Sequence, residues 1–254
     1  MVLMGLLVIV FTLLWLPKLL SRPLPAGVPG SDADALARRM MAASGYEAWN
    51  ATGAVAFSFR GKNHHLWDRQ RGYLRVSYGD VVVWLDLSSR RGIAERKGQP
   101  LAGQELQAEL DKAWALFCND TFWLNPLAKL FDDGVQRYEV AAAEDHPGTE
   151  ALLITYTSGG TTPGDSYLWF VGPDGLPTHW RMWTSILPIK GLEASWEGWT
   201  VLPTGARIAT RHAIGPASLE LEGLRAAASL AELEPGTDPF AALTALLAAP
   251  AAQG

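Results

Sequence analysis

Short runs of alternating apolar and polar residues, separated by Gly, Pro and Asp, recur along most of this chain. The earliest is "AVAFSFR", which places Val55, Phe57 and Phe59 on one face, and "YLRVSY" and "VVVWLDL" continue the pattern. Alternation with a period of two residues is typical of half-buried β-strands. Together with similar runs in the second half of the chain, this pattern predicts about ten strands.

The strands are expected to pair in antiparallel fashion. In "FVGPDGLPTHW" the Pro-Asp-Gly triplet predicts a tight turn, so Tyr167–Val171 and Thr178–Trp183 should form a hairpin. No long helix alternates with the strands, which argues against a parallel doubly wound sheet and its dinucleotide site. The chain has 11 Trp, 25 Gly and 16 Pro among 254 residues, a mixture that favours a sheet with a broad apolar face.

Composition also excludes some partners and chemistries. The net charge is −5 and the Lys and Arg residues are scattered, so no basic stripe can follow a nucleic-acid backbone. The single cysteine, Cys118, excludes an internal disulfide and lies too far along the chain to be a lipid attachment site behind a signal segment. It is interpreted as a buried apolar residue.

The N-terminal end carries a membrane signal. Residues 1–20 are almost wholly apolar and would reach about 30 Å as a helix, which predicts a transmembrane anchor or a signal segment. No Lys or Arg precedes the apolar run, whereas Lys18 and Arg22 follow it; by the positive-inside rule this placement favours a cytoplasmic domain.

The remaining boundaries follow from composition. Residues 21–30 form a Pro/Gly linker. A helix is expected to start at Ser31 as its N-cap and to end at Gly45. The main domain is predicted to span residues 31–228, and residues 229–254 form an Ala/Pro-rich tail that can hold one short helix.

A helical insertion, residues 103–134, interrupts the strands. "GQELQAELDKAWALFCND" carries apolar residues at helical spacing and is predicted to end at Asn119-Asp120. A second, shorter helix is predicted from Asn125 to Gly134. Phe122, Trp123 and Leu124 then form an elbow between the two helices, and because exposed aromatics are costly, the elbow must dock on the sheet as a lid. A lid over a curved sheet encloses an apolar groove.

The stretch "NDTFWLNPLAKLFDDGVQRYEV" resembles the LolA-like group of bacterial lipoprotein carriers and outer-membrane lipoprotein-sorting proteins. "YLWFVGPDGLPTHWRMW" and "WEGWTVLPTGARIATRH" are similar to strand pairs of that group. The resemblance implies a mainly β fold: a strongly curved antiparallel sheet, or incomplete β-barrel, covered by helices and binding an acyl chain inside. It also implies a periplasmic domain, tethered to the inner membrane or exported.

We therefore expect non-catalytic binding of a lipid, an acyl chain or a lipoprotein, without cofactor or metal. The residues expected to line the groove are large and apolar: Trp114, Phe117, Phe122, Trp123, Leu124, Trp169, Trp180 and Trp183. Asn119 and Asp120 are expected to anchor the lid by capping, and the resemblance suggests Arg207 or Arg211 as a tie between lid and sheet.

Two alternatives remain open. One is a hydrolase-type enzyme that uses His64, His65 and Asp68 in "KNHHLWD", with Asp120 as a further member. Adjacent His residues in a strand point to opposite faces, so they cannot share one metal ion, and a polar hairpin end explains the cluster as well. The other alternative is a scaffold with a filled core, in which the Trp residues only pack.

Overall fold

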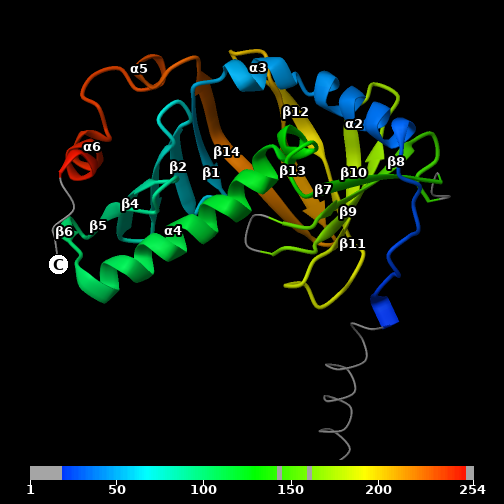
Figure 1. The fold of residues 1–254 in the computed structure, drawn as a ribbon, viewed down its shortest axis with the longest axis horizontal. Helices are drawn as coiled ribbons and strands as arrows, with labels where there is room; N and C mark the ends of the chain where they lie inside the picture. Colours follow the sequence, from blue (N-terminus) through cyan, green and yellow to red (C-terminus); the bar gives the residue numbers. More distant parts are fainter. Residues whose placement is uncertain (1–18, 142–144, 159–161, 250–254) are drawn as a thin grey trace, which may run out of the picture. The chain divides into compact units, whose positions relative to one another are not determined.

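A computed structural model describes residues 19–141, 145–158 and 162–249 of the chain. Every strand in these ranges pairs in antiparallel fashion, and the strands form two sheets, neither of which closes on itself. Figure 1 shows the fold, with colours that follow the sequence from the N-terminus to the C-terminus. The mainly β class, with antiparallel sheets and helices, is therefore confirmed.

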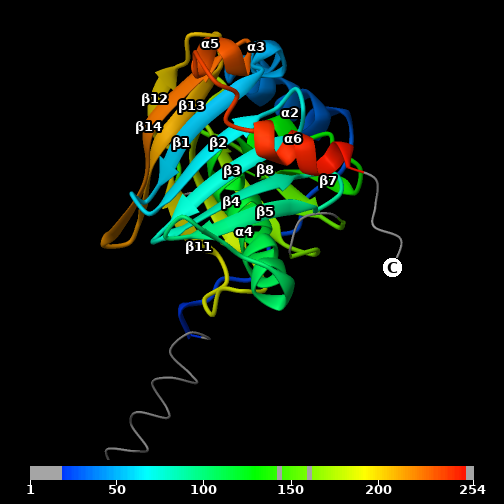
Figure 2. The same cartoon turned by 90° about the vertical axis from the view of Figure 1, so that its left-hand side faces the viewer.

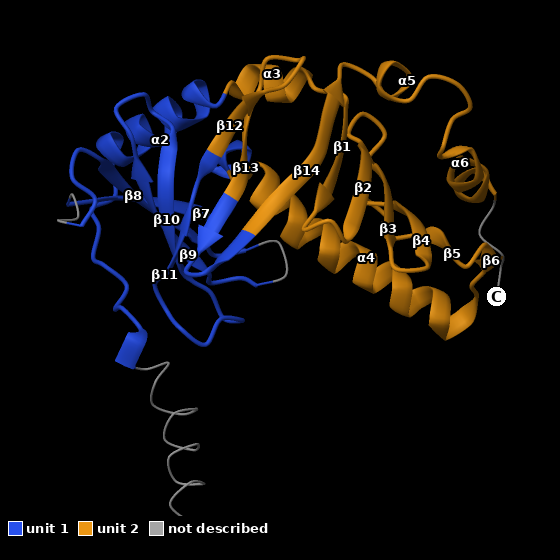
Figure 3. Cartoon of the chain, turned by 180° about the vertical axis from the view of Figure 1, so that it is seen from behind, with its two compact units in different colours: residues 1–44, 127–197, 212–218 blue, residues 45–126, 198–211, 219–254 orange. Residues whose placement is uncertain are grey.

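The chain divides into two compact units (Figure 3). Unit 1 comprises Met1–Ser44, Leu127–Glu197 and His212–Ser218, and unit 2 comprises Gly45–Pro126, Gly198–Arg211 and Leu219–Gly254. The domain limits drawn from the sequence stay predictions. Of the predicted membrane segment, residues 1–18 lie outside the described residues, and no helix within the described ranges is long and apolar enough to cross a membrane.

The larger sheet has nine strands in the order β12-β13-β14-β1-β2-β3-β4-β5-β6. Figure 2 shows β1 to β5 following one another across it. The last strand, β14, pairs with the first strand, β1, so that Ala227 lies opposite Ala54. The strands are β1 Ala54–Phe59, β2 Asn63–Asp68, β3 Tyr73–Tyr78, β4 Val81–Asp86, β5 Gly92–Arg96, β6 Gln99–Pro100, β12 Glu197–Val201, β13 Arg207–Ile214 and β14 Ala217–Ala227.

In unit 2, helices cover both faces of this sheet. Helix α4, Gly103–Leu124, packs through Leu110, Ala113 and Phe117 on a face that includes Leu74, Val76 and Val83. On the opposite face, Ala54, Ala56 and Leu66 pack against α5, Leu230–Leu233, and α6, Ala241–Ala248. A short helix, α3 at Tyr46–Ala51, precedes β1. Because side chains alternate between the two faces along β1 to β4, these strands contribute residues to two separate apolar layers, one on each face of the sheet.

The smaller sheet belongs to unit 1 and is a plain meander, ordered β11-β10-β9-β8-β7. Helix α2, Ser31–Ala43, packs against β7 and β8, and a 3-10 helix, η1 at Pro126–Lys129, leads into the sheet. The hairpin of β9 and β10 is confirmed, with Gly175 of its Pro-Asp-Gly turn at a φ of +79°. The strands are β7 Val135–Val140, β8 Glu150–Tyr156, β9 Ser166–Val171, β10 Pro177–Trp183 and β11 Leu192–Ser195.

The central helix differs from the prediction. It does not end at Asn119-Asp120 but continues to Leu124, and its C-cap is Asn125, directly before Pro126. The residue before a proline is pushed out of the helical region, which places the break there. Phe122, Trp123 and Leu124 therefore form the last helical turn, so the predicted elbow is wrong, and the predicted second helix shrinks to the 3-10 turn η1.

The start of α2 also shifts slightly. Gly30 is its N-cap and Ser31 its first helical residue, so the assignment of Ser31 as N-cap is wrong. Gly45 does adopt the left-handed conformation behind this helix, with a φ of +72°. A side chain there would also meet the Gly205 carbonyl oxygen, 2.9 Å from the Cβ position, so glycine is needed on two counts.

Candidate functional site

The linker after the apolar N-terminal segment is fixed to the small sheet. The Arg22 amide donates to the Lys190 carbonyl at 2.8 Å, and the Trp183 indole donates to the Arg22 carbonyl at 2.8 Å. At its other end, Val28 and Glu139 exchange two backbone hydrogen bonds of 2.8 and 2.9 Å. Residues 21–28 are thus held against the small sheet at both ends, and we call this segment the strap.

A glycine allows the strap to lie close to β7. A Cβ atom at Gly27 would stand 2.6 Å from the Tyr138 Cβ and 3.0 Å from the Glu139 carbonyl oxygen. Real Cβ atoms do not approach others so closely, so any side chain here would push the strap away from the sheet. Residues 21–28 of the predicted Pro/Gly linker are therefore packed against the sheet of unit 1.

A hollow of about 320 Å³ lies beside the strap, and we call it the strap hollow. Its sheet wall comes from alternate positions on β9 and β10, because Leu168 pairs with Arg181 across these strands and Trp183 lies two residues further on. The walls are mostly apolar. The lining residues are Arg22, Pro23 and Pro25 of the strap, Val140 and Ala141 at the end of β7, and Leu168, Arg181 and Trp183 of the sheet.

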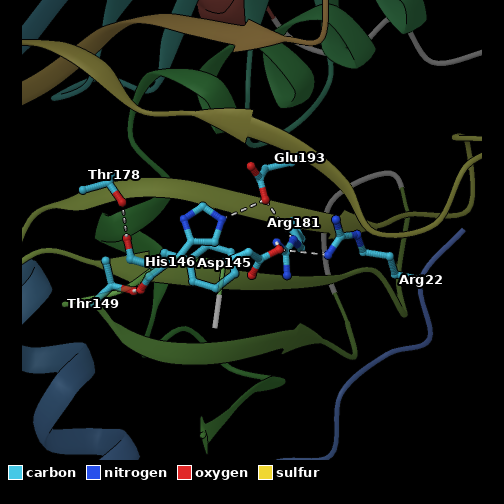
Figure 4. Close-up of polar contacts among 8 residues, drawn as sticks. Arg22, Asp145, His146, Thr149, Thr178, Arg181 and Glu193 are labelled. Atoms are coloured by element: carbon cyan, nitrogen blue, oxygen red, sulfur yellow. Dashed lines mark hydrogen bonds and ion pairs between the residues drawn. The ribbon is translucent and has the colours of Figure 1, made fainter. Parts of the chain in front are cut away.

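Charged groups gather around Arg22 and Arg181, the two arginines that line the strap hollow (Figure 4). The Arg181 side chain is only 8% exposed; its Nε donates to Glu193 at 2.8 Å and its Nη2 donates to Asp145. Arg22 Nη1 donates to the same Asp145 oxygen at 3.1 Å. One carboxylate oxygen is thus shared between two guanidinium groups.

The loop between β7 and β8 supplies the other partners. His146 stacks on Phe170, with ring centroids 3.8 Å apart and 15° between the planes, and its Nε2 lies 3.0 Å from the Glu193 carboxylate. The Thr149 hydroxyl donates to the His146 carbonyl at 2.7 Å, a hydrogen bond within the loop. Figure 4 shows His146 and Arg181 meeting at Glu193.

The surroundings favour the ionised carboxylates. Burial raises the pKa of Asp145, but hydrogen bonds from Arg181 and Arg22 outweigh it. Burial also raises the pKa of Glu193, but interactions with His146 and then with Arg181 outweigh it. Both pKa values therefore lie below the ordinary range. Burial lowers the pKa of the neighbouring His179. The cluster is a set of ion pairs beside an apolar wall, an arrangement suited to holding an amphiphilic ligand.

Only one of the predicted groove residues lines this hollow. Trp183 does so, whereas Trp169 and Trp180 lie on the opposite face of the same sheet and are fully buried. There Trp169, Trp180 and Trp196 contact one another in tilted or edge-to-face arrangements, at centroid distances of 4.7 to 5.0 Å. Among the described residues, the Trp169 indole N–H has no hydrogen-bond partner. These two indoles are packed as a core, and their role in a groove stays a prediction.

The other predicted groove residues belong to α4 in unit 2. Phe117 is buried and meets Trp67 edge to face at 5.0 Å, and Trp114 lies under the Arg90 guanidinium. Leu124 is buried, while Phe122, Trp123 and Cys118 are half-buried. Their ligand-binding role stays a prediction.

The capping role given to Asn119 and Asp120 is wrong, because both lie inside α4. Asp120 instead reaches β2: its carboxylate accepts from Asn63 Nδ2 at 2.8 Å and lies 2.7 Å from His65 Nε2. Asn119 Nδ2 donates to the second carboxylate oxygen at 2.9 Å. An ionised carboxylate can only accept, which assigns the donor role to His65 Nε2 when Asp120 is ionised. Asp120 does anchor the helix, but by a side-chain bond to the sheet.

The predicted His64, His65 and Asp68 cluster does not converge. His64 is exposed and bonds Ser58, His65 faces Asp120, and Asp68 pairs with Arg71. No group of His, Cys, Asp and Glu in the described ranges could hold a metal ion. The His65 and Asp120 side chains are 0% and 1% exposed, so a dissolved substrate does not reach them in this structure.

Arg207 and Arg211 lie exposed on β13, and their tie to α4 stays a prediction. The residues that sequence reasoning missed are those of the charged cluster: Arg22, Asp145, His146, Arg181 and Glu193. A usable signal was "THWRMW", in which one arginine sits within an otherwise largely apolar strand and so requires buried partners.

No family model matches this chain, and no curated protein matches it. Among solved structures, a DUF1329 family protein from Desulfovibrio piger is similar at 13% sequence identity and a TM-score of 0.43, over 84% of this chain and 96% of that chain. The LolA-like likeness stays a resemblance of pattern. The comparisons therefore assign no role to the residues that line the strap hollow.

Proposed function

We propose that this protein binds a single acyl chain, or a similarly slender apolar ligand, in the strap hollow and performs no catalysis on it. The observation that carries the proposal is the hollow of about 320 Å³ walled by Leu168, Trp183, Val140 and two strap prolines. Small-molecule sites run from roughly 300 to 1,000 Å³. The volume suits one chain, or one end of a longer one, better than a whole diacyl lipid.

The energetics make the proposal measurable. Burying one CH₂ group contributes about 0.8 kcal/mol, which is about fourfold in affinity. Because association itself costs at least about 4 kcal/mol, a very short chain binds poorly. Affinity should therefore rise by about fourfold per CH₂ and then level off once the hollow is filled.

We also propose that residues 1–20 tether the protein to a membrane and that the ligand is a lipid or the acyl part of a lipoprotein, with the domain in the periplasm. What supports the tether is the almost wholly apolar composition of residues 1–20. Directly behind this segment, the chain is fixed to the small sheet. Ser21 Oγ accepts from the Lys190 amide at 2.9 Å, and Arg22 bonds the Lys190 carbonyl. An alkaline carbonate wash of cell membranes tests the tether: release of the full chain into the soluble fraction would refute it.

The binding proposal is tested with the full chain in neutral phosphatidylcholine nanodiscs, titrated calorimetrically with linear alcohols from hexanol to dodecanol. Empty nanodiscs supply the blank for partition into lipid. Ala141 lines the hollow and is exposed, so Ala141→Trp should fill the hollow and abolish binding without disturbing the core. Ala108→Trp, at an exposed position of α4, is the matched control and should bind normally.

Two results would overturn the proposal. One is an affinity that does not depend on chain length. The other is normal binding by Ala141→Trp together with loss of binding in Trp123→Glu, which would place the ligand at α4 rather than in the strap hollow.

A further inference from the structure

We propose that Arg22 and Arg181 form a binding site for the anionic head group of the ligand, and that the Asp145 carboxylate stands where this head group binds. The inference rests on the proposed function, because it takes the apolar part of the ligand to lie in the strap hollow. It names the ligand class: a single-chain amphiphile that ends in an oxyanion, either a carboxylate or a phosphate monoester.

The first step is the convergence of two guanidinium groups on one oxygen atom. Arg22 reaches Asp145 Oδ2 from the strap at 3.1 Å, and Arg181 reaches the same atom from β10 (Figure 4). Guanidinium groups are planar, permanently charged and rich in donors, and they match the geometry of carboxylate and phosphate oxygens. Two of them meeting at one point form a site for an oxyanion of any origin.

The second step is that Arg181 is held in place. Its side chain is 8% exposed, lies 4.9 Å over the Phe170 ring and donates its Nε to Glu193. The other end of the guanidinium faces Asp145. Because Glu193 and Phe170 fix the orientation of this group, its donors stay directed at the same position whichever anion occupies it.

The third step is continuity with the apolar hollow. Arg22 and Arg181 both line the strap hollow, together with Leu168 and Trp183. An anion held by the two arginines is therefore at the rim of an apolar wall. An ion alone would gain nothing from that wall, whereas the chain of an amphiphile would bury its CH₂ groups against it.

The fourth step is that Asp145 is a replaceable partner. Its side chain is 49% exposed and that of Arg22 is 55% exposed, and ion pairs between exposed groups are weak and screened by salt. Among the described residues, Asp145 is the ion-pair partner of Arg22 and also pairs with the nearly buried Arg181, while Glu193 is shared by Arg181 and His146. Displacing Asp145 thus leaves a positive charge that an incoming oxyanion neutralises.

The experiment uses the full chain in neutral phosphatidylcholine nanodiscs, with octanol, octanoate and octyl phosphate as probes that share one chain and differ in the head group. Octanoate or octyl phosphate should bind at least about fivefold more tightly than octanol, and adding salt should weaken this preference. The carboxylate and phosphate arms separate the two sources of the oxyanion, and the tighter of the two names the head group.

Variants test the role of each partner. Asp145→Asn removes the charge that competes with the head group and should tighten binding of the anionic probes about fivefold. The reason is that an ion pair worth about 1 kcal/mol lowers the apparent affinity of a competing anion by about that factor. It should leave octanol unchanged. Arg22→Gln should remove most of the preference for anions, whereas Arg38→Gln, at an exposed arginine of α2, should keep it.

The outcomes separate the two proposals. Equal binding of all three probes, unchanged in Asp145→Asn, would overturn the head-group site and leave the strap hollow as a binder of neutral chains. Failure of every probe, octanol included, would overturn the proposed function and this inference with it. Anion preference that is strengthened by Asp145→Asn and lost in Arg22→Gln would support both.

Discussion

Replacing Asp120 by alanine should destabilise unit 2 strongly. In the wild type its buried carboxylate accepts hydrogen bonds from Asn63, His65 and Asn119 at 2.7 to 2.9 Å. Asp120→Ala leaves His65 and Asn63 without that acceptor, and the His65 side chain is closed to water whereas Asn63 is half-buried. Leaving a buried donor unsatisfied costs about 1–3 kcal/mol. We therefore expect unit 2 to lose about 1–3 kcal/mol.

The assay is urea unfolding of the full chain, followed by circular dichroism, combined with native-state hydrogen exchange of the α4 amides. Hydrogen exchange is needed because a chain of two compact units need not unfold in one step. Asp111→Ala is the matched control: it removes the same residue type from the same helix at an exposed position and should change stability by less than about 0.5 kcal/mol.

A loss below about 1 kcal/mol in Asp120→Ala, with α4 exchange unchanged, would refute the reasoning. It would mean that water or a rearranged side chain satisfies His65 and Asn63. A gain in stability would be more informative still, because polar groups that reduce stability are concentrated at functional sites. That result would return the His65 and Asp120 pair to consideration as a catalytic group.

Two further predictions concern the packed interior. Burial lowers the pKa of His212 to about 4, against its hydrogen bond to the Ser195 carbonyl, so between pH 4 and the unfolded value near 6.5 the unfolded chain binds the extra proton. The free energy of unfolding should reach its full value above about pH 6.5 and fall by about 3 kcal/mol towards pH 4. His212→Asn should flatten this pH dependence in urea titrations. The control His64→Asn, at an exposed position, should not. Gly92→Ala should cost about 1–3 kcal/mol, because its Cβ would stand 2.2 Å from the Trp84 carbonyl oxygen and 2.7 Å from Leu110 of α4; an unchanged urea midpoint would contradict this packing.

Local patterns predicted most of the strands but not all of them. The hairpin of β9 and β10 followed from one turn and two alternating runs. Strand β2 was missed because its two adjacent histidines resemble a polar loop, although only His64 is exposed. Strands β5 and β6 were missed because they are short and lie within a charged stretch, where pairing with β4 outweighs weak strand propensity.

Long-range partners explain the other failures. Asn119-Asp120 looked like a helix end because Asn and Asp side chains commonly bond nearby backbone groups. Asp120 instead bonds His65, 55 residues away, so the helix continues. The charged cluster was missed for the same reason: Arg22 and Asp145 are 123 residues apart, and no local spacing announces their contact.

The pairing of β14 with β1 has a consequence for how the protein is made. Ala54 pairs with Ala227, roughly 170 residues later, whereas most other neighbouring strands are joined by short connections. At about 5–20 residues per second of synthesis, β1 waits about 10–30 s for its second partner. During that time one edge of β1 is open to pairing with other chains. The rate of translation, as well as the sequence, therefore sets how long each new chain is exposed to aggregation.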